Sequence, residues 1–492
     1  MLIRNLQDAL ERRAEFDAVV KESGNVYTAG VLRADVFRLR DEMQRQLPAV
    51  EECIVGLAMK SSYQWLVAML ATHLAGATLL PVPIEFADDQ IGSLLGKADV
   101  VFVNSERLAA RIGRIIPAHA VLDLNALPTE WPFSDTPQRA PEIRRALSII
   151  HTSGTTSAPK GVILSEEGID ELLASLRSRV PHGPLEYTSV VPMSLLIEQV
   201  TGVYLPLLSG GCITFLPDEL PEFGAGIGEI NAYVDHLNST QPSFGYLPPA
   251  IVSAIDSAPP GRVAALRGMH VITGGASIQA KILESLLAKG FSIFEAYGMS
   301  ENSSMISLNF TRANRIGTAG KLLPHLEGRI ENGELEIRSK SLCLGYYNAP
   351  GEEVSTEDGW FRTGDLCELD ADGYLKIVGR RKHLIILSNA RNVSAEWVEN
   401  TYKASPMIDD IIVMGEGKST LGAVILSSND SAAVNDELTR MHEKLAHYAQ
   451  VRSIVVPEDA DKFRSDYFTV TGRPRRQQIF EDFSHMLWEE AI

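Results

Sequence analysis

The sequence holds few cysteines, no long apolar run and no excess of positive charge. Its four cysteines have neither CxxC nor metal-ligand spacing, which indicates reduced thiols: Cys53, Cys212, Cys343 and Cys367. No window reaches the roughly 18 apolar residues of a transmembrane helix, and the start of the chain has no apolar stretch that would indicate a signal peptide. The net charge of −18 argues against nucleic acid or an anionic membrane as the main partner. We therefore expect a cytoplasmic protein without a membrane span and without a nucleic-acid partner.

The residues that are present have the composition and pattern of a large α/β protein. At 492 residues the chain is too long for one core and is expected to divide into domains. Short β-branched runs at residues 54–58, 100–103 and 212–216 predict buried strands, and residues 64–74 have the pattern of a helix. This alternation predicts parallel sheets covered by helices.

One loop has the composition of a phosphate-binding site. Residues 152–161 read Thr-Ser-Gly-Thr-Thr-Ser-Ala-Pro-Lys-Gly and follow the apolar run 146–150, which predicts a buried strand. Glycines allow close approach of the backbone, amides and hydroxyls donate hydrogen bonds, and Lys160 adds a positive charge. The spacing is not that of a P-loop NTPase. The alternative interpretation is a flexible Ser/Gly linker.

The loop resembles the phosphate loop of the adenylate-forming superfamily, which includes acyl-CoA synthetases, aryl-CoA ligases, peptide-synthetase adenylation domains and beetle luciferases. Three further motifs follow in the order that this family has. They are Glu-Ala-Tyr-Gly-Met-Ser-Glu at residues 295–301, Thr-Gly-Asp at 363–365 and Gly-Arg-Arg-Lys at 379–382. Four ordered motifs rarely arise by chance, so we identify the chain as a member, nearest in appearance to long-chain acyl-CoA synthetases.

The resemblance implies an α/β fold with two parts. A large N-terminal domain, residues 1–382, would contain parallel-type sheets covered by helices and a small β-barrel. A mobile C-terminal α+β lid, residues 383–492, would follow, with the hinge near Lys382. The alternation of polar and apolar residues at 334–338 and 374–378 independently predicts a small antiparallel sheet or barrel.

The resemblance also implies a reaction in two steps. Family members join a carboxylate to the α-phosphorus of ATP with release of pyrophosphate, and then pass the acyl group from AMP to a thiol. The expected cofactors are ATP and Mg²⁺, with coenzyme A as co-substrate. Because the first step is an in-line displacement, positioning and charge neutralisation should supply most of the catalysis.

Matching the motifs assigns the triphosphate and metal positions. The residues matched to the phosphate loop are Thr152, Ser153, Gly154, Thr155, Thr156 and Lys160. Glu301 matches the carboxylate that ligates Mg²⁺, a hard cation that prefers oxygen ligands. Ser300 has a hydroxyl within reach of the α-phosphate, and Tyr297, next to Gly298, has a ring that can stack on adenine.

Further matches concern the nucleoside and the hinge. The residues similar to the adenine-side loop of the family are Gly274, Gly275 and Ala276. Asp365 matches the aspartate that accepts hydrogen bonds from both ribose hydroxyls, and Arg380 matches an arginine that contacts ribose or phosphate. Lys382 stands at the hinge position, and this role rests wholly on the resemblance.

The chain departs from the family in its last motif. Relatives carry a lysine there that contacts the acyl carboxylate and the α-phosphate, whereas this chain has Arg473, followed by Arg476 at the distal arginine. Arginine keeps the charge but is planar and bulkier, so the exchange is not conservative. Adenylation is then slowed, carried out by Arg473 in its own geometry, or lost. We favour an active enzyme that uses Arg473.

Two other departures concern the substrates. Asn389 replaces a glycine that passes close to the thiol substrate. Leu195 replaces the histidine of a segment that also contains Glu198, and with Tyr246 these residues are expected to form the acyl wall. The segment offers no aspartate for an ammonium group, which would be costly to leave unpaired. A fatty or aryl acid is therefore favoured over an α-amino acid.

Three hypotheses remain open. The first is an acyl-CoA synthetase, and the second is a ligase that loads the phosphopantetheine of a carrier protein. The third is a non-catalytic nucleotide-binding paralogue. A luciferase-like oxygenase is disfavoured because Ile386 stands where luciferases have a lysine.

Overall fold

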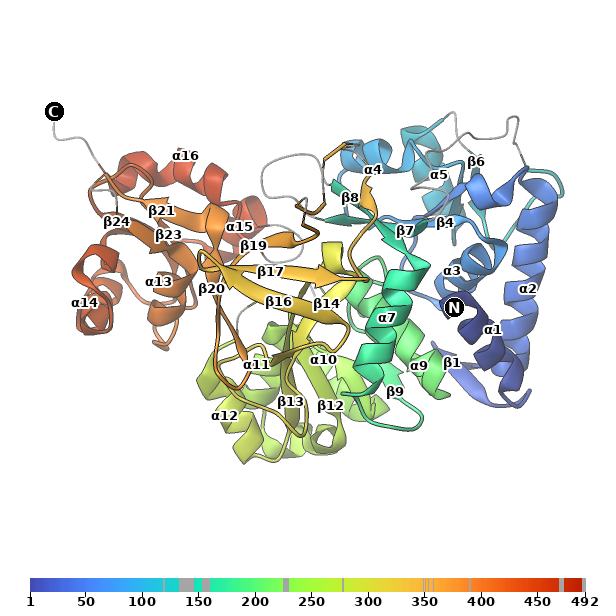
Figure 1. Cartoon of the computed structure of the whole chain (residues 1–492), viewed down its shortest axis with the longest axis horizontal. Coiled ribbons are helices and arrows are strands. Elements are labelled where there is room, and N and C mark those ends of the chain that lie inside the picture. Colours follow the sequence, from blue (N-terminus) through green and yellow to red (C-terminus); the bar gives the residue numbers. More distant parts are fainter. Residues whose placement is uncertain are drawn as a thin grey trace.

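The computed structural model describes residues 1–117, 120–131, 146–152, 160–223, 230–276, 278–347, 349, 351–352, 354–356, 358–388, 391–468 and 473–488. The N-terminal helices and the C-terminal elements lie at opposite ends of the molecule, with the antiparallel strands β16, β17, β19 and β20 between them (Figure 1).

One sheet is built around the apolar runs of the first part of the chain. Among the described residues its strand order is β18-β8-β7-β4-β3-β5-β6. The strands are β3 (Ile54–Leu57), β4 (Thr78–Pro81), β5 (Val100–Val103), β6 (Ala120–Asp123), β7 (Ala146–Thr152), β8 (Lys160–Ser165) and β18 (Gly345–Tyr346). β3, β4 and β5 are parallel and buried along their whole length, which requires continuous apolar sequence.

The helix predicted at 64–74 is present as α3 (Tyr63–Ala75). It begins where the Ser62 side chain accepts a hydrogen bond from the Trp65 amide, and it ends at Gly76 in the left-handed conformation, φ 83°. Nearly all its side chains are buried, because it lies between the sheet and α2 (Ala29–Gln46).

A second, mostly parallel sheet carries the motif around residue 297. Its described strands lie in the order β15-β14-β13-β12-β11-β9-β10-β1-β2. Their bounds are β1 (Ala18–Glu22), β2 (Asn25–Thr28), β9 (Glu186–Thr188), β10 (Cys212–Thr214), β11 (Phe244–Tyr246), β12 (His270–Gly274), β13 (Ser292–Met299), β14 (Ser304–Leu308) and β15 (Lys321–Leu322). The strand expected at 212–216 is thus confirmed.

The two alternating segments lie in one antiparallel sheet, as predicted. Among the described residues its order is β16-β17-β19-β20, and every pair is antiparallel. The strands are β16 (Leu326–Glu331), β17 (Glu334–Ser339), β19 (Phe361–Leu369) and β20 (Leu375–Arg380). The Thr-Gly-Asp motif therefore lies within a strand, β19, and the Gly-Arg motif ends its neighbour β20.

Helices cover the two larger sheets, and in the sequence many of them lie between successive strands. They are α1 (Leu2–Arg12), α4 (Asp88–Leu95), α5 (Glu106–Ile115), α7 (Glu166–Arg177), α8 (Leu196–Glu198), α9 (Leu205–Ser209), α10 (Ile230–Thr240), α11 (Pro249–Ser257) and α12 (Ala280–Ala288). α8 continues through a π-helical segment, Gln199–Tyr204, into α9. Such segments are rare and often occur at functional sites.

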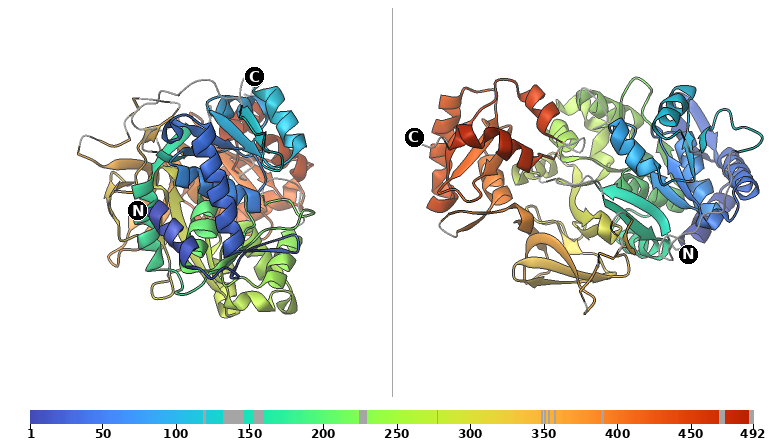
Figure 2. Two further views of the ribbon diagram at one scale, coloured as in Figure 1. Left: turned by 90° about the vertical axis from the view of Figure 1, so that its right-hand side faces the viewer. Right: turned by 90° about the horizontal axis from the view of Figure 1, so that it is seen from above.

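The C-terminal part has its own sheet and helices. The elements are β21 (Leu384–Ile386), β22 (Asn392–Ser394), α13 (Ala395–Tyr402), β23 (Asp410–Met414), β24 (Leu421–Leu426), α14 (Ser431–Met441), β25 (Val451–Val455), α15 (Ala460–Tyr467) and α16 (Arg476–Leu487). The right-hand view of Figure 2 shows them gathered at one end of the molecule. Their apolar clusters contain described residues from 385 onward, whereas the other clusters end at 375. The boundary at 382 remains a prediction, and these clusters support it.

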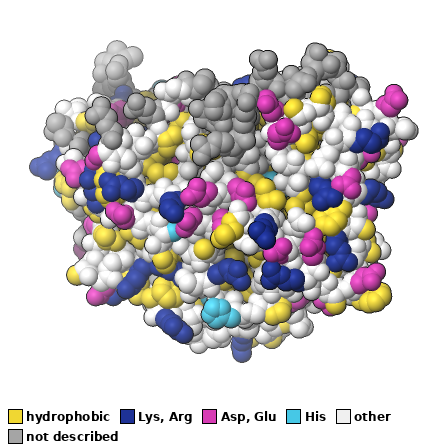
Figure 3. Space-filling view, turned by 45° about the vertical axis from the view of Figure 1, so that its right-hand side comes forward, with side chains coloured by type: hydrophobic (Ala, Val, Ile, Leu, Met, Phe, Trp, Pro, Cys, Tyr) yellow, Lys and Arg dark blue, Asp and Glu magenta, His cyan; other side chains and the backbone are white. Residues whose placement is uncertain are grey.

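The surface carries charges of both signs (Figure 3), and the thiols lie in the interior. Positive and negative side chains are interspersed on the face drawn in Figure 3. No helix of the described residues has the length and apolar character needed to cross a membrane. All four cysteines are buried and form no disulfide bond.

Candidate active site

A buried carboxylate lies at the centre of the site. Asp365 is 2% exposed, and its Oδ1 lies 2.7 Å from Nε of Arg380, its partner residue on β20. The Tyr297 hydroxyl donates a hydrogen bond to Oδ2. A carboxylate is costly to bury without such partners. Three residues predicted from separate motifs therefore meet here, from β13, β19 and β20.

The contacts with Arg380 and Tyr297 do not use all the lone pairs of Asp365. Each carboxylate oxygen has two lone pairs, so Oδ1 and Oδ2 can each accept one further hydrogen bond. Burial and the charge of Asp365 raise the pKa of Tyr297, so its hydroxyl stays a donor. The arrangement suits a pair of neighbouring hydroxyl donors, as ribose has. Stacking of adenine on the Tyr297 ring remains a prediction.

At two motif positions the backbone of the neighbouring strand is too close for any residue but glycine. A Cβ atom on Gly298 would lie 1.7 Å from the Ser304 carbonyl oxygen, and one on Gly274 would lie 2.4 Å from that of Ala296. Gly275 follows in the left-handed conformation, φ 81°. The predicted adenine loop, Gly274 to Ala276, therefore begins at the end of β12.

The predicted acyl wall meets this loop. The Tyr246 hydroxyl donates a hydrogen bond of 2.9 Å to the Gly274 carbonyl oxygen. Burial raises the pKa of Tyr246 to about 12; the charge of Glu198 acts in the same direction and that of Arg473 in the opposite one. The charges of Glu198, in the segment assigned to the acid, and of Arg473, assigned to its activation, therefore both act on Tyr246.

Glu301 lies in a 3-10 turn, Ser300–Asn302, directly after β13. Its carbonyl oxygen accepts a 2.7 Å hydrogen bond from the Cys343 amide. Burial raises the pKa of Tyr346, and the charge of Glu301 raises it further, so that ring is a neighbour of the carboxylate. No group of three or more His, Cys, Asp or Glu side chains able to hold a metal occurs among the described residues. One carboxylate suits Mg²⁺, which usually takes its other ligands from phosphates and water.

Arg473 and Lys382 share one electrostatic environment. Loss of solvent and the charge of Arg380 lower the pKa of Arg473, while Asp365 and Glu301 act in the opposite direction. The pKa of Lys382 is lowered by burial, by Arg380 and by Arg473. Both side chains still contact solvent. The structure therefore brings two cations of distant sequence position to the two acidic residues of the site.

The distal arginine of the last motif stays within the C-terminal part. Arg476 pairs with Glu399 of α13 at 2.5 Å, and it donates a hydrogen bond of 3.2 Å to the Val413 carbonyl oxygen. Glu399 accepts a hydrogen bond from the Val413 amide with its other oxygen. These contacts join α16 to α13 and β23. They therefore hold in place the helix that follows Arg473.

The segment assigned to the acid is largely buried. Leu195 precedes α8 and is half-buried, and Glu198 is completely buried. Glu198 Oε2 accepts a 2.7 Å hydrogen bond from the Tyr187 hydroxyl. Burial, with a smaller contribution from the charge of Glu222, raises the pKa of Glu198 to about 8. Contact of Leu195 and Glu198 with a substrate remains a prediction.

Replacing this buried carboxyl by an amide should change how stability depends on pH. Folded protein keeps the Glu198 proton up to about pH 8, whereas the unfolded chain loses it near its ordinary value of 4.5. More protons are bound in the folded state, so stability falls as pH rises through this interval. Glu198→Gln removes this loss, and Tm should fall less between about pH 5 and about pH 8.

The measurement is Tm by calorimetry across that range, with the exposed Glu186→Gln as the matched control. Glu222, whose pKa burial raises to about 7, keeps part of the pH dependence in the variant. Equal slopes for wild type and Glu198→Gln would contradict the prediction.

Part of the predicted phosphate site lies outside the described residues. This holds for Ser153, Gly154, Thr155 and Thr156, and for Asn389 of the thiol-side loop. The backbones of Thr152 and Lys160 are described, and these residues are partners in the β7–β8 pair. The loop thus connects two paired strands, the first of which is the strand that the apolar run predicted.

Sequence reasoning missed two residues that contact the site. Tyr346 neighbours Glu301, and Glu334 contacts both the Thr-Gly-Asp motif and the residue after Arg380. Neither residue belongs to a motif that we recognised, and an isolated Tyr or Glu in an alternating strand gives no signal of its own.

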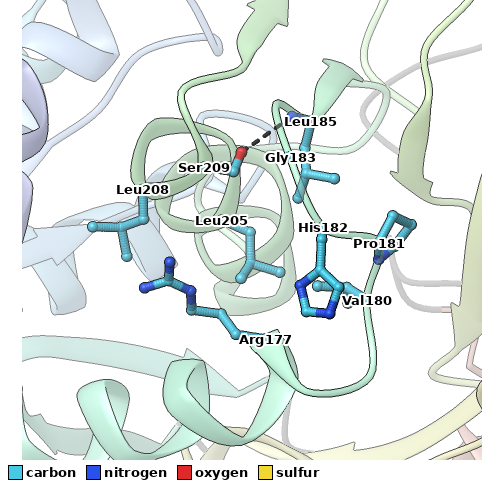
Figure 4. Close-up of a pocket in the computed structure, with 9 residues that line it drawn as sticks. All are labelled: Arg177, Val180, Pro181, His182, Gly183, Leu185, Leu205, Leu208 and Ser209. Carbon is cyan, nitrogen blue, oxygen red and sulfur yellow. Dashed lines mark hydrogen bonds between the residues drawn. The ribbon is translucent and has the colours of Figure 1, made fainter.

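A cavity of about 150 Å³ lies elsewhere, between the end of α7 and α9 (Figure 4). Its lining includes Arg177, His182 and Leu205, and the Leu185 amide donates a 3.1 Å hydrogen bond to the Ser209 hydroxyl at its edge. None of the residues assigned to the nucleotide lines it, so it is separate from the candidate site.

Comparisons with known proteins agree with the motifs. The chain matches the model of the AMP-binding enzyme family over residues 6–347 and that of the AMP-binding enzyme C-terminal domain over 382–461. A putative fatty-acid–CoA ligase, fadD11 of Mycobacterium tuberculosis, is 29% identical in an alignment 350 residues long that covers 60% of this chain and 60% of that protein. The chain therefore aligns with only about three fifths of that relative. Indoleacetate–CoA ligase of Aromatoleum aromaticum is 24% identical, over 90% of this chain and 91% of that protein.

Solved structures share the fold over nearly the whole chain. The amide bond synthetase McbA from Marinactinospora thermotolerans has a TM-score of 0.81 at 19% identity, covering 98% of this chain and all of that one. The o-succinylbenzoate coenzyme A synthetase MenE from Bacillus subtilis, in complex with AMP, has a TM-score of 0.77 at 17% identity, covering 96% and 97%. The matched family model covers more than half of the sequence, and the chain belongs to the AMP-binding enzyme family.

Proposed function

We propose that the protein is an AMP-forming acid–thiol ligase that converts a fatty or aryl carboxylic acid to its coenzyme A thioester. The observation that carries the proposal is the meeting of Tyr297, Asp365 and Arg380, with the cation of Arg473 acting on the same carboxylate. The names of relatives, among them fatty-acid, indoleacetate and succinylbenzoate CoA ligases, support the reaction class. The absence of a carboxylate at residues 193–196 supports an acid without an ammonium group.

In the first step the carboxylate oxygen attacks the α-phosphorus of ATP, and the bond to pyrophosphate breaks. Asp365 would hold the ribose hydroxyls, and Glu301 would hold Mg²⁺ beside the phosphates. Mg²⁺ neutralises phosphate charge when it is bound. Arg473 would contact both the acid and the α-phosphate, where negative charges approach each other. In the second step the thiol sulfur attacks the acyl carbonyl, and AMP leaves.

The division at residue 382 and a cytoplasmic location are part of the same proposal. The C-terminal residues 383–492 would act as the lid, and the thiol would reach the acyl-adenylate after the lid turns. The reduced, buried cysteines suit a reducing compartment.

The test is pyrophosphate release from ATP and Mg²⁺, with hydroxylamine as acceptor and a panel of fatty, aryl and amino acids. Release with fatty or aryl acids, followed by thioester formation when coenzyme A is added, would support the proposal. Transfer to a phosphopantetheinyl carrier protein but not to coenzyme A would contradict the named thiol. ATP binding without release for any acid would contradict catalysis and favour a non-catalytic paralogue.

A further inference from the structure

Glu334 is a buried carboxylate that the mechanism does not use. It is the first residue of β17 and is 4% exposed. The two preceding residues, Asn332 and Gly333, have φ values of 51° and 78°. Positive φ at both central residues is typical of a type I′ hairpin turn, which joins two strands tightly and in a fixed register. The turn therefore fixes the place at which the Glu334 side chain enters the sheet.

The two oxygens of Glu334 bind groups on either side of the Asp365–Arg380 pair. Oε1 accepts a 2.9 Å hydrogen bond from the amide of Gly364, the residue before Asp365. Oε2 lies 2.9 Å from Nη2 of Arg381, the residue after Arg380. One carboxylate thus connects the strand that carries the buried aspartate with the strand end that carries its arginine.

The backbone at Gly364 needs this support. Gly364 has a φ of 73°, in the left-handed region, so β19 departs from regular strand geometry directly before Asp365. The pairing of β17 with β19 shifts register between Glu334 and Glu336, and that of β19 with β20 shifts between Leu366 and Cys367. The regular hydrogen bonds between strands are disrupted at such irregularities. The Glu334 carboxylate therefore serves as acceptor for the Gly364 amide in place of a backbone oxygen.

We propose that Glu334 is a positioning residue that sets the orientation of Asp365 toward the ribose and joins it to the hinge segment through Arg381. The proposal rests on the proposed function, because Asp365 must be the ribose-binding group. Glu334 acts through Asp365. Its loss leaves the Gly364 amide without its acceptor and Arg381 without its partner, so the Asp365 carboxylate is held less tightly.

The test measures discrimination between ATP and 2′-deoxy-ATP in pyrophosphate release. Asp365→Asn weakens a charged hydrogen bond to the ribose and should lower the ratio of kcat/KM values for the two nucleotides by about tenfold. Glu334→Ala should lower the same ratio by about three- to tenfold, since misplacing a positioned group costs part of its effect. Glu334→Gln keeps an oxygen that can accept the Gly364 hydrogen, and it should retain most of the ratio.

The chain offers a matched control on the same strand. Glu336 is 2% exposed and binds two arginines, with Oε2 2.6 Å from Arg329 Nη2 and Oε1 3.1 Å from Arg362 Nε. Glu336→Ala should lower Tm and leave the nucleotide ratio unchanged. If Glu334→Ala does not fold, Glu334→Asp is the substitute variant. Its shorter side chain keeps the charge but places the carboxylate farther from the Gly364 amide, so it should also lower the nucleotide ratio.

The outcomes separate the two proposals. A lowered ratio in Asp365→Asn and an unchanged ratio in the folded Glu334 variants would overturn the role of Glu334 and leave the ribose assignment intact. An unchanged ratio in Asp365→Asn would overturn the ribose assignment, and with it the positioning role. Equal loss of ratio in Glu336→Ala would show a general effect of sheet damage and would also overturn it.

Discussion

Replacing Arg473 by alanine is expected to lower the rate of pyrophosphate release by about 10²- to 10³-fold, the usual cost of removing one group that stabilises charge in a transition state. The reason is the placement of this guanidinium, whose pKa responds to Asp365, Glu301 and Arg380. Attack of a carboxylate on a phosphate brings two negative groups together. A cation at that point therefore stabilises the transition state more than the ground state. The measurement is steady-state pyrophosphate release at saturating ATP and acid.

Arg473→Lys is the matched variant, because it keeps the charge but replaces a planar fork by a point charge. It should retain far more activity than the alanine variant. ATP affinity, measured separately by calorimetry, should change much less than the rate, which would distinguish a catalytic role from a binding role. Pyrophosphate release near the wild-type rate in Arg473→Ala would contradict the assignment and point to Lys382, the other cation of the site, as the activating group.

The parts of the fold that could be predicted were those with a local signal. β3 and β5 are buried on both faces, so their sequences are apolar throughout, and α3 has a capping serine and a terminal glycine. β19 was not predicted as a strand. Its residues include Arg362, Gly364 and Asp365, whose backbone is held by partners on β17 and β20 that only the folded chain brings near.

The difference between local sequence signals and contacts made only in the folded chain applies to the site as well. Tyr297, Asp365 and Arg380 were assigned by motif, but the contact of the Tyr297 hydroxyl with Asp365 joins residues 68 positions apart and has no sequence pattern. Glu334 has no motif at all, because its role depends on a strand pairing. Residues whose function lies in supporting another side chain are therefore harder to find from one sequence than those that touch the substrate.

The C-terminal part is held against the rest of the molecule by contacts that a turning lid must break. The Ser394 hydroxyl donates a 3.0 Å hydrogen bond to the Val378 carbonyl oxygen, and Gln279 Nε2 donates one of 2.6 Å to the Lys403 carbonyl oxygen. In this arrangement the charges of Asp365 and Glu301 act on Arg473, as the proposed adenylation step would need. We propose that thioester formation uses a second arrangement, reached by rotation about a residue near Lys382.

Lys382→Pro is expected to spare adenylation and to slow thioester formation by about 100-fold. Lys382 lies in the 3-10 turn Arg381–His383. Residues of a 3-10 helix usually have φ of about −50° to −70°, which suits proline in the first turn of a helix. A second arrangement that needs another φ would then cost about 3 kcal/mol, which corresponds to about 100-fold in rate. The measurements are pyrophosphate release with hydroxylamine for the first step and acyl-CoA formation for the second.

Two variants separate the backbone effect from others. Lys382→Ala removes the same ammonium but leaves φ free, so it should retain most of the second step. Gln279→Ala removes a contact of the present arrangement alone, and should weaken adenylation rather than thioester formation. Equal loss of both half-reactions in Lys382→Pro would contradict a hinge at this residue, because a hinge restricts only the step that follows rotation.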